Sequence, residues 1–186
     1  AQLFERQRKL LEEQKVVLDS FIETLATSID ARDKITSGHS SRVKMYSSLI
    51  AQEFGMEKND LYILEKAAAL HDIGKIATPD SILQKPGKLT AAEYEIMKQH
   101  AATGEDIILQ TFYNLDDADF RQIAYEAARF HHEKFNGKGY PDGLAGEQIP
   151  LHARIMAIAD VFDAVSQKRC YRDAMPLEES FSIIEK

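Results

Sequence analysis

The sequence predicts an all-α protein with an extended N-terminal helix. Amphipathic segments, with apolar residues at helical spacing, follow one another along most of the chain. No segment shows the convincing alternation of apolar and polar residues that indicates a half-buried strand. The first segment also carries an apolar stripe at seven-residue intervals. These three observations favour a helical bundle with one helix that is longer than the domain needs.

That first helix is expected to span residues 3–29. Its seven-residue stripe consists of Phe4, Leu11, Leu18 and Leu25, among residues rich in Glu, Gln, Lys and Arg and without Gly or Pro. Such a stripe with charged flanks is typical of a two-stranded coiled coil, and we favour a dimerising or signal-transmitting helix over one that only packs on its own domain. The chain is thus divided into a signalling helix, residues 1–28, and a domain, residues 29–186.

The domain is predicted to contain five further helices. They are a helix over 38–54, a helix over 59–75 with Asn59 as its N-cap, a helix opened by a capping box of Thr90 and Glu93, a helix over 118–130, and a helix over 151–167. A loop rich in Gly, Pro and Asn is expected over residues 133–150.

Composition limits the classes of partner. The 186 residues carry 44% hydrophobic and 28% charged residues, which is ordinary for a globular domain. No apolar run approaches the roughly 20 residues that a membrane span needs. A net charge of -7 argues against binding duplex nucleic acid through a broad basic face. Small anionic ligands stay possible, because metal ions and a few local cations can supply a positive field.

Several histidines lie at positions that are typical of metal ligands. His39, His71 and His100 lie on or near the apolar faces of three predicted helices. A buried imidazole must bond or ligate something, since an unsatisfied buried polar group costs about 1–3 kcal/mol. One such residue would most often be a satisfied core histidine, but three of them, joined by the pairs His71-Asp72 and His131-His132, indicate a metal centre.

With Asp160 on the last predicted helix, the candidate ligands number seven. They are His39, His71, Asp72, His100, His131, His132 and Asp160. Five imidazoles and two carboxylates without a thiolate suit two divalent ions, with iron or manganese favoured and magnesium, nickel or zinc as the other candidates. Two such ions favour in-line displacement at phosphorus by an activated water.

Three cations near these ligands are candidates for phosphate binding. Lys75, one turn after His71, is predicted to be catalytic together with Asp72, and to contact a phosphate oxygen. A favourable charge at a helix C-terminus is an equally good explanation of Lys75 from its spacing alone. Arg169 and Arg172 are expected to clamp a second phosphate, and the alternative for them is a solvated helix end.

Four blocks of the sequence resemble the HD-GYP family of metal-dependent phosphohydrolases. The first block is Thr36-Ser-Gly-His39-Ser-Ser-Arg-Val, and the second, His71-Asp72-Ile-Gly-Lys75, is similar to the HD motif. The third runs from His131-His132-Glu133 to Gly139-Tyr140-Pro141, and the fourth from Arg154 through Asp160 to Asp163-Ala. The resemblance covers the chain from about residue 29 onward.

The resemblance implies an HD-type helical bundle that hydrolyses the bacterial second messenger cyclic di-GMP to linear pGpG, which some members cut again to GMP. One ion would be held by His39, His71, Asp72 and Asp160. The other would be held by His100, His131, His132 and Asp72. Lys75, Arg169 and Arg172 would contact substrate phosphates, Tyr140 the substrate side, and the loop Gly139-Tyr140-Pro141 a GGDEF-domain partner.

Two other readings of the function stay open at this point. One is a cyclic-dinucleotide-binding or partner-docking module that turns over slowly, and the other is a hydrolase of a different cyclic dinucleotide. Two departures from the family pattern also matter. Ile35 stands where some relatives carry a glutamate ligand for a third metal, so two ions are expected. The chain also ends before the last helices of such a domain.

The cellular setting is an expectation as well. Cys170 is the only cysteine, so no internal disulfide can form, which fits a reducing bacterial cytoplasm. The chain begins without a methionine and ends inside an amphipathic pattern, which suggests a fragment of a larger sensor or response regulator. We expect a homodimer formed through the N-terminal helix.

Overall fold

A computed structural model describes residues 2–33, 38–167 and 174–184. Within these ranges the chain is helical and contains no strand, only one isolated bridge between Asn136 and Ala145. The prediction of an all-α protein is confirmed. The elements are α1 (Gln2–Arg32), α2 (His39–Glu53), α3 (Lys58–Leu70), the 3-10 helix η1 (Ile73–Ala77), α4 (Asp80–Leu83), α5 (Ala91–Thr111), α6 (Ala118–Phe130), the 3-10 helix η2 (Gly146–Gln148), α7 (Leu151–Ser166) and α8 (Leu177–Ile184).

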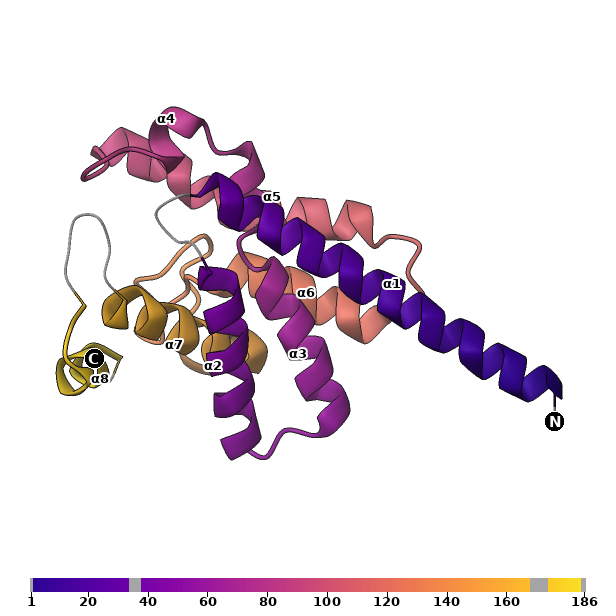
Figure 1. The fold of residues 1–186 in the computed structure, drawn as a ribbon. Helices are drawn as coiled ribbons and strands as arrows, with labels where there is room; N and C mark the ends of the chain where they lie inside the picture. Colours follow the sequence, from indigo (N-terminus) through magenta and orange to yellow (C-terminus); the bar gives the residue numbers. More distant parts are fainter. Residues whose placement is uncertain (1, 34–37, 168–173, 185–186) are drawn as a thin grey trace.

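The helices pack as neighbouring pairs around one apolar core. Helix α3 lies between α2 and α6, α7 packs on the other side of α2, and α5 packs on α6 and on η1 (Figure 1). Many of the fully buried positions are alanines, among them Ala67, Ala124, Ala127 and Ala159. Small side chains at helix contacts allow the backbones to come close, so functional groups on different helices can meet in the core.

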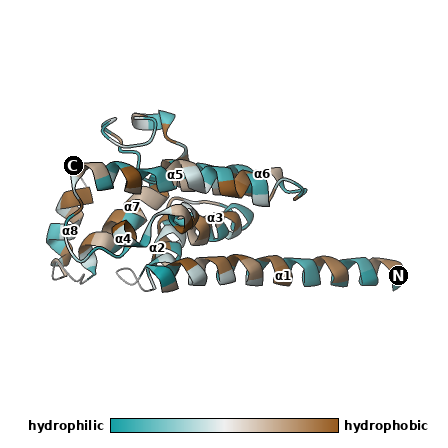
Figure 2. Ribbon diagram, turned by 90° about the horizontal axis from the view of Figure 1, so that it is seen from above, coloured by the Kyte–Doolittle hydropathy of each residue, from teal (hydrophilic) through white to brown (hydrophobic). Residues whose placement is uncertain are grey.

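Helix α1 is longer than the body that it packs against. Its C-terminal part buries Ile22, Ala26 and Ile29 in the core, whereas its N-terminal half extends beyond the other helices (Figures 1 and 2). Apolar side chains on that half are exposed, including Phe4 at 79% and Leu11 at 60%. The predicted long helix is confirmed. The first two residues of its apolar stripe, Phe4 and Leu11, are left uncovered within the single chain, whereas Leu18 and Leu25 pack against the core.

The start of α5 agrees with the predicted capping box. The Thr90 hydroxyl accepts a hydrogen bond from the Glu93 backbone N–H at 3.3 Å, and the Glu93 carboxylate accepts one from the Thr90 N–H at 2.7 Å. Lys85 also donates to that carboxylate at 2.6 Å, and with Thr90 it lowers the pKa of Glu93 to about 2. These contacts fix the beginning of the helix that carries His100.

The predicted helix over 59–75 is wrong at both ends. Helix α3 begins at Lys58, after Glu57, and ends at Leu70, and the chain then turns into η1. Glycine is a weak helix former, and at Gly74 its missing side chain allows a close backbone approach. A Cβ there would lie 1.9 Å from the His100 carbonyl oxygen and 2.6 Å from the Gly104 nitrogen. Gly74 thus lets η1 lie directly against α5.

The end of α1 is hydrogen-bonded to η1 and to the residues that follow it. The Arg32 guanidinium donates to the carbonyl oxygens of Lys75 at 3.1 Å, Ile76 at 2.5 Å and Thr78 at 2.7 Å, and to the Asp80 carboxylate at 2.9 Å. An arginine with several fixed acceptors holds them in one geometry.

None of the helices in the described ranges is long and apolar enough to cross a membrane.

Candidate metal centre

The seven predicted ligands come together in the core of the bundle. His39 is the first residue of α2, His71 directly follows α3, Asp72 precedes η1, His100 lies in α5, His131 and His132 follow α6, and Asp160 lies in α7. Two groups of side chains place their ligand atoms within 4.8 Å of one another, and Asp72 belongs to both. The site therefore offers two adjacent metal positions with a shared carboxylate.

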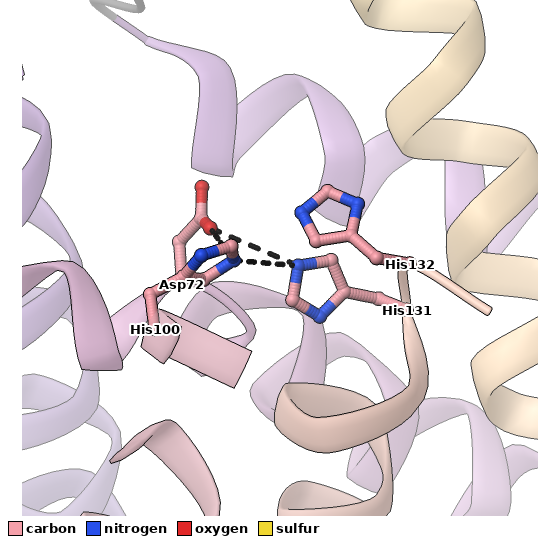
Figure 3. Close-up of side chains that lie close together, drawn as sticks. All are labelled: Asp72, His100, His131 and His132. Carbon is pink, nitrogen blue, oxygen red and sulfur yellow. Dashed lines mark hydrogen bonds and ion pairs between the residues drawn. The ribbon is translucent and has the colours of Figure 1, made fainter. Parts of the chain in front are cut away.

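The first group contains Asp72, His100, His131 and His132 (Figure 3). Oδ1 of Asp72 lies 3.4 Å from Nε2 of His100 and 3.8 Å from Nε2 of His131. The two imidazole nitrogens lie 3.3 Å from each other. The His132 ring, 4.0 Å from that of His131 between centroids, closes the group.

The second group contains His39, His71 and Asp72. Oδ2 of Asp72 lies 3.3 Å from Nε2 of His71 and 3.7 Å from Nε2 of His39. Asp160 faces both groups, because its Oδ1 lies 3.2 Å from Nε2 of His39 and its Oδ2 lies 3.8 Å from Nδ1 of His132. The carboxylates of Asp72 and Asp160 thus lie between the two sets of imidazoles.

The hydrogen bonds of three histidines show that this donor set fits cations. The Nδ1 atoms of His71, His100 and His131 face the backbone carbonyls of Ala68, Met97 and Ala127 at 2.7, 2.7 and 2.9 Å. A carbonyl oxygen only accepts, so each Nδ1 carries the hydrogen and each Nε2 is left with a lone pair.

Among the described residues, these lone pairs have no hydrogen-bond donor. The Nε2 atoms of His100 and His131 face each other across 3.3 Å, and the buried Nε2 of His71 has no hydrogen-bond partner in the part of the chain that the structure describes. Facing acceptors repel unless a positive charge lies between them, and an unsatisfied buried acceptor costs free energy. The arrangement therefore fits divalent ions with nitrogen and oxygen ligands.

The electrostatics favour the forms that bind metal at most of these positions. Burial would raise the pKa of Asp72 and Asp160. Lys75 and His71 nevertheless hold the pKa of Asp72 well below its ordinary range, and His39 and His132 do the same for Asp160. Burial lowers the pKa of His131 strongly and that of His132 to about 3, so both rings are neutral at pH 7. His39 differs: burial lowers its pKa, yet hydrogen bonds to Asp160 and Asp163 outweigh burial and raise it to about 9.

Asp163 is a buried part of the site to which the sequence did not assign a role. Its Oδ2 lies 2.7 Å from Nδ1 of His39, and its Oδ1 accepts a hydrogen bond from Nε of Arg42 at 2.5 Å. A carboxylate on the far nitrogen orients an imidazole and makes it a better ligand. The helical spacing from Asp160, three residues earlier on α7, was the available sequence clue.

We expect Asp163→Asn to weaken metal binding without removing a direct ligand. Loss of the carboxylate on His39 should raise the dissociation constant for Mn²⁺ by about 10- to 100-fold. Titration of metal-free protein with Mn²⁺ measures this, with circular dichroism to show that the variant is folded. Asp116→Asn, at an exposed carboxylate, is the matched control. An unchanged Mn²⁺ affinity in Asp163→Asn would remove Asp163 from the support of the site.

Lys75 lies beside the shared carboxylate. Its Nζ is 2.7 Å from Oδ2 of Asp72 and 3.3 Å from Oδ2 of Asp33, and these carboxylates outweigh burial and raise its pKa. Its alternative explanation, a favourable charge at a helix C-terminus, applies to a different element, because α3 ends at Leu70 and Lys75 lies in the last turn of η1. Arg169 and Arg172 lie outside the described residues. The same holds for Ile35, on which the expectation of two ions rests.

The loop with Gly139, Tyr140 and Pro141 folds back onto the end of α6. A Cβ on Gly139 would lie 2.4 Å from the Glu133 Cα and from the Lys134 nitrogen, so only glycine allows this approach. The buried Glu133 carboxylate accepts hydrogen bonds from the backbone N–H groups of Asp142 and Gly143 at 2.7 and 3.0 Å. The Tyr140 ring thereby lies 4.7 Å from the His132 ring between centroids.

A helical bundle with paired His/Asp groups around a shared aspartate defines a metal-site domain of the HD type. The chain belongs to the HD-domain family, whose model, described as "HD domain", matches residues 23–186. The resemblance to the HD-GYP branch is confirmed by its relatives.

Three similar proteins illustrate the kinship. The chain is 43% identical over 152 residues to the 3'3'-cGAMP-specific phosphodiesterase 2 of Vibrio cholerae, covering 82% of this chain and 28% of that protein. It is 42% identical over 163 residues to the cyclic di-GMP phosphodiesterase response regulator RpfG of Xanthomonas campestris, covering 88% and 42%. A solved structure, the HDG"Y"P protein Bd1817 of Bdellovibrio bacteriovorus, shares the fold at a TM-score of 0.58 and 21% identity, covering 81% and 51%. The chain spans less than half the length of these two curated relatives.

Proposed function

We propose that this domain hydrolyses cyclic di-GMP to linear pGpG at a two-metal centre. The observation that carries the proposal is the shared Asp72, whose two oxygens face two groups of imidazoles with free Nε2 lone pairs. Paired metal positions of this kind are typical of in-line attack on a phosphodiester. Similarity to RpfG, described as a cyclic di-GMP phosphodiesterase, supports the substrate class.

The proposed ligand sets follow the two groups. His39, His71, Asp72 and Asp160 hold one ion, and His100, His131, His132 and Asp72 hold the other, with iron or manganese as the expected metals. Ions bound there supply charge stabilisation on the phosphoryl oxygens and acidify a water.

Residues of the chain do the rest of the proposed chemistry. Asp72 fixes both metal positions in one geometry, and His71, His100 and His131 are held in the ligating tautomer by backbone carbonyls. The Lys75 ammonium lies 2.7 Å from Asp72 and is proposed to donate to a phosphate oxygen that enters the site. Tyr140, beside His132, is proposed to contact the substrate, and Arg169 and Arg172 to contact its phosphates.

The test is elemental analysis of purified protein, followed by chromatography of cyclic di-GMP digests with Mn²⁺ or Fe²⁺ added. We expect divalent metal, turnover to pGpG, and a loss of turnover after chelation that either ion restores. GMP would report a second cut. Metal-replete protein that binds cyclic di-GMP without turning it over would contradict the enzymatic proposal and identify a binding module.

A second candidate substrate is 3'3'-cGAMP. The relative from Vibrio cholerae described as 3'3'-cGAMP-specific is as similar to this chain as RpfG is. Competition between the two cyclic dinucleotides in one digest decides between them, and preferential loss of 3'3'-cGAMP would replace the first proposal.

Two partner surfaces belong to the same proposal. The exposed part of the apolar stripe of α1, with Phe4 and Leu11, supports pairing with a second copy of the chain. In a coiled coil, such heptad residues pack against the same residues of the partner helix. The loop Gly139-Tyr140-Pro141 is proposed to dock a GGDEF-domain protein, with Pro141 exposed to meet it. The cytoplasm of a bacterium is the proposed location.

A further inference from the structure

A cavity of about 630 Å³ opens beside the metal centre. His100 and His132 contribute to its lining. The end of α4, the segment between α4 and α5, and Tyr94 of α5 line much of the rest, and Asp33 also contributes. A cyclic dinucleotide has two phosphodiesters and two bases, and only one phosphodiester can lie at the metals. The remainder must contact the wall away from the histidines.

That wall is basic in a protein whose net charge is -7. Lys75, Lys85, Lys88 and Lys134 line the cavity. Lys75 is paired with Asp72 and Asp33, and Lys85 with Glu93. Among the described residues, no carboxylate lies within ion-pair distance of Lys88 or Lys134. These two exposed ammonium groups are therefore available to an anion at little cost, since no ion pair must first be broken.

Aromatic rings stand next to these lysines. Tyr94 and Tyr140 both line the cavity, and their rings meet edge to face at 6.3 Å between centroids. The Lys98 ammonium lies 5.5 Å from the Tyr94 ring centroid and 5.7 Å from that of Tyr140, which holds the two rings in place. Tyr94 is 47% exposed, so part of its ring can still accept a stacked base.

We propose that this wall is a second subsite for the cyclic dinucleotide. Lys88 and Lys134 bind the phosphodiester that is not being cut, and Tyr94, supported by Tyr140, stacks on a purine base. The proposal rests on the proposed function and extends it, because it names the groups that hold the half of the substrate away from the metals. Lys134 follows His132 by two residues, so one short segment connects the candidate metal centre to the proposed phosphate-binding lysine.

The test measures binding separately from turnover. Isothermal titration with a hydrolysis-resistant phosphorothioate analogue of cyclic di-GMP is carried out on metal-loaded wild type and on the double variant Lys88→Met/Lys134→Met. We expect the dissociation constant to rise about 10- to 100-fold, because two charge-assisted contacts are lost. The matched control is Lys58→Met/Lys138→Met, which removes the same charge from exposed lysines that do not line the cavity.

The proposed stacking of a base on Tyr94 is tested with a second pair of variants. Tyr94→Ala should weaken binding of the analogue about tenfold, and Tyr94→Phe should keep most of the affinity, because stacking needs the ring and not the hydroxyl. Tyr113→Ala, at an exposed tyrosine at the end of α5 outside the cavity, controls for the loss of an exposed ring.

The outcomes separate the two proposals. An equal loss in the test and control lysine variants, or no loss in either, overturns the second subsite even if wild type hydrolyses cyclic di-GMP. No binding of the analogue to wild type overturns it as well. Selective loss of binding supports the subsite, whereas absent turnover with intact, lysine-dependent binding overturns only the proposed hydrolysis.

Discussion

Asp72→Ala is expected to release bound metal and to abolish most of the proposed hydrolysis of cyclic di-GMP. Asp72 is the one side chain that belongs to both ligand groups, with Oδ1 facing His100 and His131 and Oδ2 facing His71 and His39. Loss of a residue that only supports a ligand already costs about 10- to 100-fold, so loss of a shared ligand should lower turnover by more than about a hundredfold. Elemental analysis and turnover are measured on the same sample.

The control for this variant is Asp106→Ala, which removes an exposed carboxylate from α5 and should change neither metal content nor turnover. Asp72→Ala protein that keeps two ions per chain and its activity would show that the two groups do not share a ligand. Loss of activity with full metal content would instead assign Asp72 a role in handling the substrate alone.

Gly74→Ala is expected to destabilise the domain strongly, although it adds only one methyl group. The new Cβ would lie 1.9 Å from the His100 carbonyl oxygen, 2.6 Å from the Gly104 nitrogen and 2.8 Å from the His100 carbonyl carbon. All three are backbone atoms of a helix, so they cannot rotate away as a flexible side chain does. We expect a loss of at least about 3 kcal/mol in the free energy of unfolding, at the upper end of overpacking effects.

This substitution should also disturb the metal centre. Gly74 follows His71-Asp72 by two residues, and the clash is with the residue that supplies the His100 imidazole, so η1 and α5 must separate. Thermal unfolding should show a fall of about 6 °C or more in Tm, together with a lower metal content.

Gly104→Ala is the comparison on the same seam between η1 and α5. Its nearest new contact is the Ala128 Cβ at 3.1 Å, and alanine gains about 1 kcal/mol of helix propensity over glycine, so its effect should be much smaller. If Gly74→Ala and Gly104→Ala unfold at the same temperature, the close approach of η1 to α5 is not what requires glycine.

The seven candidate ligands were identifiable from sequence because their chemistry is rare on apolar helix faces. His71-Asp72 and His131-His132 are pairs of ligand residues at helix ends, and His39, His100 and Asp160 interrupt apolar faces. Helix α6 and the capping box of α5 were predicted correctly, since their start signals are local. Local signals of this kind do not need the tertiary fold.

The parts that sequence missed depend on partners far along the chain. Asp163 contacts His39, 124 residues away, so its spacing from Asp160 on the same helix is a clue to its position but does not identify its partner. The end of α3 was placed too late because the requirement for glycine at position 74 comes from α5, which no local pattern reports. Tyr94 lies on an exposed helix turn, and its proposed role in binding could not be predicted without its contact with Tyr140.

The junction where α1 ends gives the long helix a direct mechanical connection to the site. The Arg32 guanidinium donates to the carbonyl oxygens of Lys75, Ile76 and Thr78, and the carboxylate of the next residue, Asp33, lies 3.3 Å from the ammonium of Lys75. A rotation or an axial shift of the protruding part of α1 is therefore expected to move these carbonyl oxygens and that ammonium. Residues 32 and 33 connect the long helix directly to the segment beside the candidate metal centre.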